Sequence, residues 1–194
     1  MKVLIACEES QAVTKAFRAK GHEAYSCDIQ PCSGGHPEWH IHDDVTKHLD
    51  EGWDLIIAHP VCTRLTNSGV CWLAKRNLWD EMRAGAEFFN IFKGKAPKVA
   101  IENPIPHKYA REIIGRYSQI IQPWMFGHTE KKATCLWLEG LPELKETNNV
   151  KAETDALPKS ESQKIHYLPP SADRAKLRSK TYQGIAEAMA EQWG

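Results

Sequence analysis

Residues 53–69 read WDLIIAHPVCTRLTNSG, and this stretch decides the predicted fold. The apolar run over residues 55–58 is short and ends at a His-Pro turn, which is typical of a strand buried on both faces of a parallel sheet. A polar loop that ends at Gly69 follows the turn. Reactive groups in parallel sheets lie just past the carboxyl ends of the strands. Cys62 has this position, and it is therefore our candidate nucleophile.

The rest of the chain alternates between strand-like and helical segments. Further strands are expected at 2–6, 23–27, 97–101, 119–124 and 134–138. Helices are expected after Ser10 as N-cap, and at 46–51, 73–92, 109–114 and 184–193. Residues 30–40 are expected to be a turn-rich loop, and the proline-containing residues 142–170 an extended loop. Strands separated by helices predict a single α/β domain over residues 1–194, with a doubly wound, mostly parallel sheet.

The composition is that of an ordinary globular protein, with 26% charged and 42% hydrophobic residues. Lys+Arg and Asp+Glu both number 25, which argues against a strongly electrostatic nucleic-acid binder but allows a local basic face. No stretch is long and apolar enough for a signal peptide or a membrane span. We therefore expect a cytoplasmic protein with no membrane partner, whose six cysteines are mostly reduced.

Glu102 follows the strand predicted over residues 97–101, as Cys62 follows that over residues 55–58. If the two strands are neighbours they lie about 4.8 Å apart, and a thiol and a carboxylate then share one crevice. A thiolate adds to an electrophilic carbon, and a carboxylic acid can protonate the ring nitrogen that takes up the charge. This pairing suits conjugate addition to a pyrimidine. The alternative is that Cys62 is a small apolar loop residue and Glu102 caps the Asn-Pro turn.

Several motifs resemble those of the DNA cytosine-5 methyltransferases. Residues 60–69 (PVCTRLTNSG) resemble the nucleophile loop of that family, and residues 101–104 (IENP) resemble its Glu-Asn-Val motif. Residues 181–186 (TYQGIA) resemble the C-terminal motif that closes the cofactor pocket. The chain as a whole resembles short, phage-borne proteins of this type. Those proteins lack a target-recognition domain, and here residues 142–170 stand in its place.

The resemblance implies S-adenosylmethionine as the cofactor, and cytosine in DNA or a cytosine nucleotide as the substrate. It implies that Cys62 adds to C6 of cytosine while Glu102 assists at N3, after which C5 takes the methyl group. In duplex DNA the base would have to be flipped out of the stack. The residues implied to contact the cofactor are Ala6, Cys7, Glu8, Ser10, Asp28, Ile29, Asp43, Asp44, Pro60 and Gly184. Those implied to contact the substrate are His59, Thr63, Asn67, Asn103, Lys132, Thr134 and Arg178.

The chain departs from the family pattern at two places. Glu8 and Glu9 stand where glycines let the backbone approach the cofactor, and Val61 replaces the second proline of the nucleophile loop. The alternative function is therefore that of a catalytically inactive relative, which binds a nucleic acid, a nucleotide or a protein.

Two further patterns have competing interpretations. Cys27, Cys32, His36 and His40 invite a zinc site, but their intervals fit no common zinc finger, and we expect no metal. The basic residues Arg174, Lys176, Arg178 and Lys180 either track phosphates or form a solvated face.

Overall fold

The protein contains one seven-stranded sheet, seen in a computed structural model that describes residues 1–171 and 173–194. The strand order is β3-β2-β1-β4-β5-β7-β6, and β7 runs antiparallel to both of its neighbours. The strands are β1 (Lys2–Ala6), β2 (Glu23–Asp28), β3 (His40–His42), β4 (Leu55–Ala58), β5 (Lys98–Pro104), β6 (Gln119–Ile121) and β7 (Thr134–Glu139). The predicted doubly wound, mostly parallel sheet is confirmed, and only the reversed β7 departs from a parallel arrangement.

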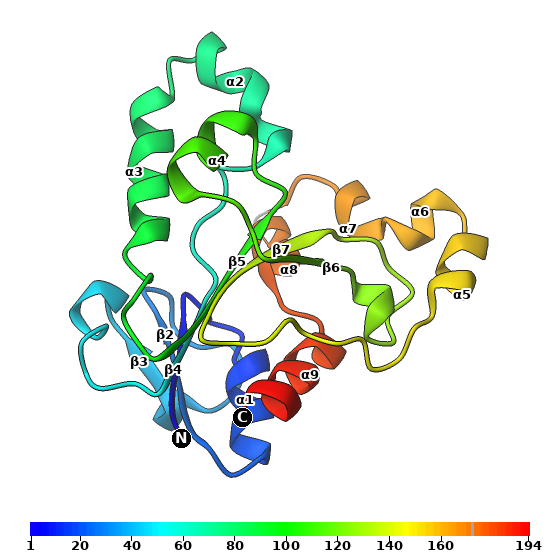
Figure 1. Cartoon of the computed structure of the whole chain (residues 1–194). Coiled ribbons are helices and arrows are strands. Elements are labelled where there is room, and N and C mark those ends of the chain that lie inside the picture. The colour runs from blue at the N-terminus through cyan, green and yellow to red at the C-terminus, as the bar shows by residue number, and fades with distance from the viewer. Residues whose placement is uncertain (172) are drawn as a thin grey trace.

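Helices cover both faces of this sheet (Figure 1). One face carries α1 (Ala12–Ala19) and α9 (Gln183–Trp193), and the other carries α2 (Val70–Lys75), α3 (Trp79–Asn90) and α4 (Lys108–Ile114). Short helices follow β7, namely α5 (Lys151–Ala156), α6 (Lys159–Ser162), α7 (Lys164–Tyr167) and α8 (Arg174–Ser179). Single 3-10 turns lie at Pro37–Trp39, Val45–Lys47, Asn67–Gly69 and Pro123–Met125. Across residues 1–171 and 173–194, no helix has both the length and the hydropathy needed to cross a bilayer.

Strand β4 occupies the centre of the sheet and is buried on both faces, as predicted. Leu55 and Ile57 join the apolar cluster under α1 and α9. Ile56 and Ala58 join the cluster under α2, α3 and α4. Because side chains alternate along a strand, a continuous apolar run of four residues supplies two to each core. The sheet order changes direction between β1 and β4, so a ligand crevice is expected at their carboxyl ends.

The start of α1 differs from the prediction that Ser10 is its N-cap. The helix begins at Ala12, and the chain enters it through Gln11 in the left-handed region, with φ 56°. The Glu8 carboxylate instead accepts from the Val13 and Thr14 amides, at 2.7 and 3.2 Å, and from the Thr14 hydroxyl at 2.8 Å. Glu8 caps the helix because the left-handed turn folds its side chain back over the first helical turn.

The helix predicted over residues 73–92 is interrupted. Helix α2 ends at Lys75, and Asn77 adopts φ 49°. The Leu78 amide then donates to the Leu73 carbonyl at 2.9 Å, and the Asn77 amide donates to Ala74. This is the hydrogen-bond pattern of a Schellman motif, in which Asn tolerates the left-handed position. The chain therefore changes direction before α3 begins.

The prediction that residues 142–170 form an extended loop is wrong for three segments, which are the helices α5, α6 and α7. Thr154 and Ser162 are buried within this region. The Val150 amide donates to the Trp124 carbonyl at 2.9 Å, and the Lys131 amide donates to Ser162 at 2.7 Å. Helices of four to six residues are too short for a periodic apolar pattern and depend on packing against the rest of the chain.

Two predictions near β2 also need correction. Residues 40–42, where no strand was predicted and the predicted loop 30–40 ends, form β3 and pair with β2 through Ser26, Cys27 and Asp28. The helix predicted over residues 46–51 is only the 3-10 turn Val45–Lys47. Both elements contain three residues, which is too few for either periodicity to appear in the sequence.

Candidate active site

The carboxyl ends of β4 and β5 lie side by side, as predicted, with Ala58 paired to Ile101. His59 follows β4, and its amide donates to the Ala6 carbonyl at 2.9 Å. Glu102 does not lie beyond its strand as expected, because β5 continues to Pro104 through pairing with β7. A strand fixes the direction of its side chains more firmly than a loop does, so Glu102 is held in place by the sheet.

His59 and Glu102 form a nearly buried pair at this edge. His59 Nδ1 lies 3.0 Å from Glu102 Oε2, and the side chains are 11% and 13% exposed. Burial lowers the pKa of His59, but the hydrogen bond and the negative charge of Glu102 outweigh it, so the pKa is raised. Burial likewise raises the pKa of Glu102, and the bond from His59 outweighs it, so the pKa is lowered. The proton of the pair therefore resides on His59, and Glu102 is ionised.

The other ring nitrogen of His59 is Nε2, which points away from Glu102. Nε2 is buried and makes no hydrogen bond to any residue that the structure describes. A buried polar atom without a partner costs about 1–3 kcal/mol, so it marks a position where a ligand atom would be favourable. Because Nδ1 is held by Glu102, Nε2 is the nitrogen left to meet a substrate.

Cys62 lies in the loop after β4 and is partly buried. Burial raises the pKa of its thiol, and the charge of Glu102 raises it further. The positive charges of Lys132 and Arg178 act in the opposite direction. The thiol is thus neutral in this state, and the predicted residues Cys62, Glu102, Lys132 and Arg178 are brought into one electrostatic neighbourhood.

His107 holds the nucleophile loop, and sequence reasoning did not find this residue. Its amide donates to the Leu65 carbonyl at 3.0 Å, and its Nε2 lies 2.8 Å from the Arg64 carbonyl. His107 Nδ1 accepts from the Ala110 amide at 3.0 Å, so the proton must be on Nε2. The Asn67 amide also donates to the Ile105 carbonyl at 3.1 Å. These bonds stiffen the loop that Val61 leaves without its second proline.

The remaining predicted substrate contacts divide into two groups. Thr63 and Asn67 are exposed on the nucleophile loop. Asn103 is fully buried, and the alternation of strand β5 turns it away from the face that carries Glu102. Thr134 is also buried, and its hydroxyl donates to the Lys132 carbonyl at 3.2 Å. Strand alternation therefore turns the Asn103 side chain away from the Glu102 face, whereas Thr134 lies on that face, two residues from the Leu136 that pairs with Glu102.

The C-terminal motif is fastened to the segment that carries Lys132. The Tyr182 hydroxyl donates to the buried Glu130 carboxylate at 2.7 Å, and Lys132 Nζ lies 5.8 Å from the centroid of the Tyr182 ring. The Gly184 amide donates to His128 Nε2 at 2.9 Å, and a Cβ on Gly184 would lie 2.0 Å from the Phe126 carbonyl oxygen. Gly184 was predicted as a cofactor contact, but its close packing against Phe126 already requires a glycine at this position.

The turn after β1 has the shape of a ligand cradle despite its lack of glycine. Cys7 has φ 59° and Gln11 has φ 56°, both in the left-handed region that non-glycine residues rarely adopt. The Cys7 and Glu8 amides donate to the Cys27 carbonyl at 2.7 and 3.3 Å. Such strained backbone concentrates at functional sites. The sharp turn that would ordinarily need glycines is therefore formed here by Cys7 and Gln11.

The predicted cofactor residues after β2 and β3 lie around this turn. Burial raises the pKa of Cys7 to about 12, and the charges of Asp28 and Asp44 contribute, so these groups are near one another. Ile29 is 69% exposed beside Asp28. Asp28 accepts from the Gln30 amide at 2.8 Å.

The other predicted cofactor residues are already engaged within the protein. Asp44 Oδ1 accepts from the amide and the hydroxyl of Thr46, at 2.9 and 2.8 Å. Asp43 pairs with Lys47 at 2.7 Å and with His48 at 3.2 Å. Pro60 is buried, and the Glu8 carboxylate accepts hydrogen bonds from the amides of Val13 and Thr14 in α1. An aspartate that caps a turn can still offer its second oxygen to a ligand, which favours Asp44 over Asp43.

Three of the four side chains considered for zinc, those of Cys27, His36 and His40, make other contacts. Cys27 is buried, and its Sγ lies 3.6 Å from the Asp43 carbonyl. The His36 ring stacks on Trp39 with centroids 3.8 Å apart, and His40 lies 2.8 Å from the Ser26 hydroxyl. Among the described residues, no three or more His, Cys, Asp or Glu side chains are arranged to hold a metal. These side chains are used for folding contacts.

The fold of this chain is similar to the folds of several solved structures. A methyltransferase from Entamoeba histolytica, EhMeth, superposes with a TM-score of 0.50 at 13% identity, over 88% of this chain and 60% of that chain. The fold is that of the S-adenosylmethionine-dependent methyltransferases. The S. pombe Dnmt2 methyltransferase gives a TM-score of 0.46 at 15% identity, over 90% of this chain and 61% of that one. Sequence comparison gave no match to a protein-family model or to a curated protein.

The methyltransferase fold explains the position of the two halves of the crevice. The strained turn after β1 lies on one side of the point where the strand order reverses, and Cys62 with the His59–Glu102 pair lies on the other. The chain spans about 60% of the length of the solved structures it matches.

Proposed function

We propose that this chain transfers a methyl group from S-adenosylmethionine to C5 of cytosine, in DNA or in a cytosine nucleotide. The observation that supports this most is the position of Cys62 beside the nearly buried His59–Glu102 pair at the carboxyl ends of β4 and β5. A nucleophile, a proton carrier and two cations in one crevice suit addition to a heteroaromatic ring.

The left-handed turn after β1 is the feature that fits the cofactor. It bends the backbone sharply at the carboxyl end of β1, the end of a parallel strand at which ligands bind. The apolar Ile29 and the carboxylates of Asp28 and Asp44 suit an adenine ring, a ribose hydroxyl and an exocyclic amine. When bound, S-adenosylmethionine would supply an electrophilic methyl group.

Cys62 begins the reaction by forming a bond from Sγ to C6 of cytosine. The thiol must first lose its proton to solvent, and the positive charges of Lys132 and Arg178 stabilise the thiolate that results. As C6 accepts the sulfur, charge accumulates on the ring and N3 gains a proton. Since Glu102 is ionised and His59 is protonated, that proton comes from the His59–Glu102 pair rather than from a neutral Glu102.

The remaining steps restore the enzyme. C5 takes the methyl group, a base removes the C5 proton, the bond from Sγ to C6 breaks and the N3 proton returns to the pair. His59 and Glu102 therefore exchange one proton with the substrate twice in each cycle. The role first assigned to Glu102 alone becomes a role of the two residues together.

The test uses deoxycytidylate and single-stranded DNA that carry 5-fluorocytosine, because fluorine at C5 cannot leave as a proton does. With S-adenosylmethionine present, mass spectrometry should find a covalent adduct at Cys62, and Cys62→Ser should form none. His59→Gln should form the adduct more slowly, since a neutral amide cannot donate the proton. Cofactor binding is measured separately by calorimetry. If neither S-adenosylmethionine nor its demethylated product binds, the chain is a binding module and the proposal fails.

A further inference from the structure

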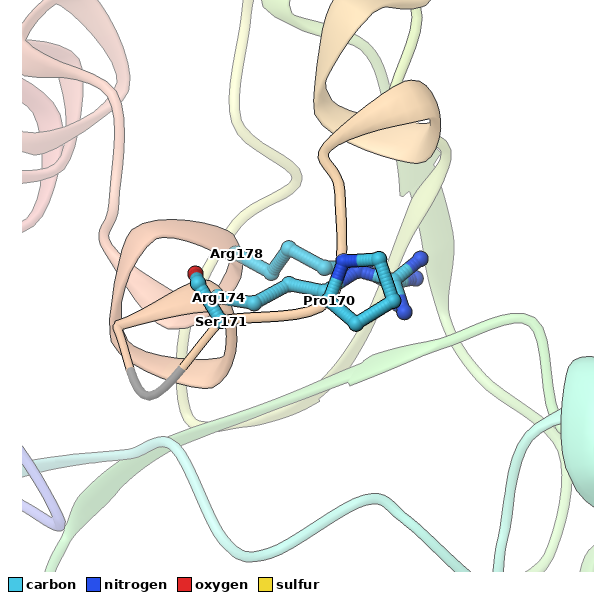
Figure 2. A pocket seen from close by; sticks show the side chains of 4 residues that line it. All are labelled: Pro170, Ser171, Arg174 and Arg178. Atoms are coloured by element: carbon cyan, nitrogen blue, oxygen red, sulfur yellow. The ribbon is translucent and has the colours of Figure 1, made fainter.

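Two arginines of α8, Arg174 and Arg178, line an open cavity. The cavity has a volume of about 340 Å³ and is lined by Pro170, Ser171, Arg174 and Arg178. Figure 2 shows both arginine side chains leaving α8 in the same direction and passing the Pro170 ring. Because Arg174 and Arg178 are four residues apart in a helix, they share one face of it. The cavity thus has two guanidinium groups on one wall.

These two positive charges have no carboxylate partner among residues 1–171 and 173–194. Arg64 and Arg83 each pair with a carboxylate, whereas Arg174 and Arg178 form no ion pair with any residue that the structure describes. Arg174 Nε is buried and has no hydrogen-bond partner within that same part of the chain. Neighbouring like charges repel one another, and an unpaired buried donor costs free energy. An anion in the cavity would remove both penalties.

The position of α8 relates this cavity to the crevice. Lys176, on the same helix, lies 3.7 Å from the Glu9 carboxylate in the turn after β1. Arg178 is near enough to Cys62 for its positive charge to act on the thiol. Helix α8 therefore reaches the turn at the carboxyl end of β1 through Lys176, at the same edge of the sheet as the start of the Cys62 loop.

We propose that Arg174 and Arg178 together bind a phosphate group of the cytosine-bearing substrate. Guanidinium groups bind phosphate through paired, charge-assisted hydrogen bonds, and a volume of about 340 Å³ lies at the small end of the range of about 300–1,000 Å³ for ligand sites. Ser171 also lines the cavity. This inference rests on the proposed function, because it makes the phosphate part of the substrate that Cys62 attacks.

The phosphate has two sources, a monoester on a free nucleotide and a diester in a strand. Calorimetry compares deoxycytidine, deoxycytidylate and a short single strand that contains one cytosine with flanking abasic sites. A monoester site binds deoxycytidylate more tightly than deoxycytidine. A diester site binds the single strand more tightly than it binds deoxycytidine or deoxycytidylate, and its affinity for the strand falls as salt is added. Either result supports the proposal.

The variants are Arg174→Gln, Arg178→Gln and the double substitution. Each single change should weaken the phosphorylated ligand about 10- to 100-fold, the usual loss for a hydrogen bond between charged groups. Deoxycytidine should bind equally to all of them. Lys159→Gln is the matched control, because Lys159 is exposed on α6 and its replacement removes the same charge. Circular dichroism checks that each variant is folded.

Two outcomes would overturn the proposal. One is that phosphorylated ligands bind no more tightly than deoxycytidine. The other is that the double variant still binds phosphorylated ligands more tightly than deoxycytidine, by the same factor as the wild type. Deoxyuridylate separates this inference from the proposed function. If it binds as deoxycytidylate does and depends on the arginines, while no ligand forms an adduct at Cys62, the phosphate site stands and cytosine methylation fails.

Discussion

Replacing Glu8 by Ala should destabilise the protein far more than replacing Ser10, although a sequence pattern favours Ser10 as the helix cap. Glu8 is 4% exposed and accepts three hydrogen bonds from Val13 and Thr14 at the start of α1. Glu8→Ala leaves those three donors without an acceptor, and it removes a negative charge from the amino end of a helix.

The expected cost follows from these contacts. Loss of an N-cap side chain costs about 1–2 kcal/mol, and buried donors left unpaired add about 1–3 kcal/mol. Because the three bonds share one carboxylate, their losses do not add fully, and we expect a total of about 3 kcal/mol. For a protein of this size that lowers Tm by roughly 6–12 °C. Glu8→Gln keeps one acceptor oxygen and should lose about half as much.

The assay is urea unfolding without cofactor, followed by circular dichroism, on wild type, Glu8→Ala and Ser10→Ala. The Ser10 side chain makes no hydrogen bond within the described residues, so its loss should change the free energy of unfolding by less than about 0.5 kcal/mol. The slope with urea should be the same for all three proteins. A loss at Ser10 equal to or larger than that at Glu8 would show that the assignment of the cap is mistaken.

Three further predictions concern other parts of the chain. Gly184→Ala should destabilise the protein by about 3 kcal/mol in urea unfolding, since its Cβ would lie 2.0 Å from the Phe126 carbonyl oxygen; an unchanged midpoint would contradict this packing. Because the pKa of His59 is raised and that of Glu102 is lowered, their pair stabilises the fold most between about pH 4.5 and 6.5. The difference in unfolding free energy between wild type and Glu102→Gln should therefore shrink as pH rises above 6.5, and a constant difference up to about pH 9 would exclude the pair. Asn77→Ala should cost about 1 kcal/mol and Asn77→Gly almost nothing in thermal unfolding, because residue 77 has φ 49°; equal effects would argue against the left-handed turn.

Much of the fold is visible in local patterns. The run Leu55–Ala58 predicted a strand buried on both faces, and it supplies both cores. The α4 and α9 helices were placed within a residue or two. Such elements are predictable because their apolar pattern is long or continuous enough to identify a strand or a helix from the local sequence alone.

The misses are elements whose stability comes from distant partners. Strand β3 contains three residues and exists because β2 offers it hydrogen bonds. Helices α5, α6 and α7 contain four to six residues and pack on the segment around Trp124 and Lys131. In each case the local propensity is weak, and contacts far along the sequence decide the conformation.

The candidate site divides in the same way. The sequence by itself placed Cys62 after one buried strand and Glu102 near the carboxyl end of another, since apolar runs and turn residues are local features. Only the tertiary structure decided that His59 binds Glu102, that Asn103 is turned to the other face, and that the positive charge of Arg178 acts on Cys62. Those relations depend on sheet register and on the path of α8, which no local pattern encodes. The candidate nucleophile was thus identified from the sequence, whereas the His59–Glu102 pair and the charges around Cys62 come from the fold.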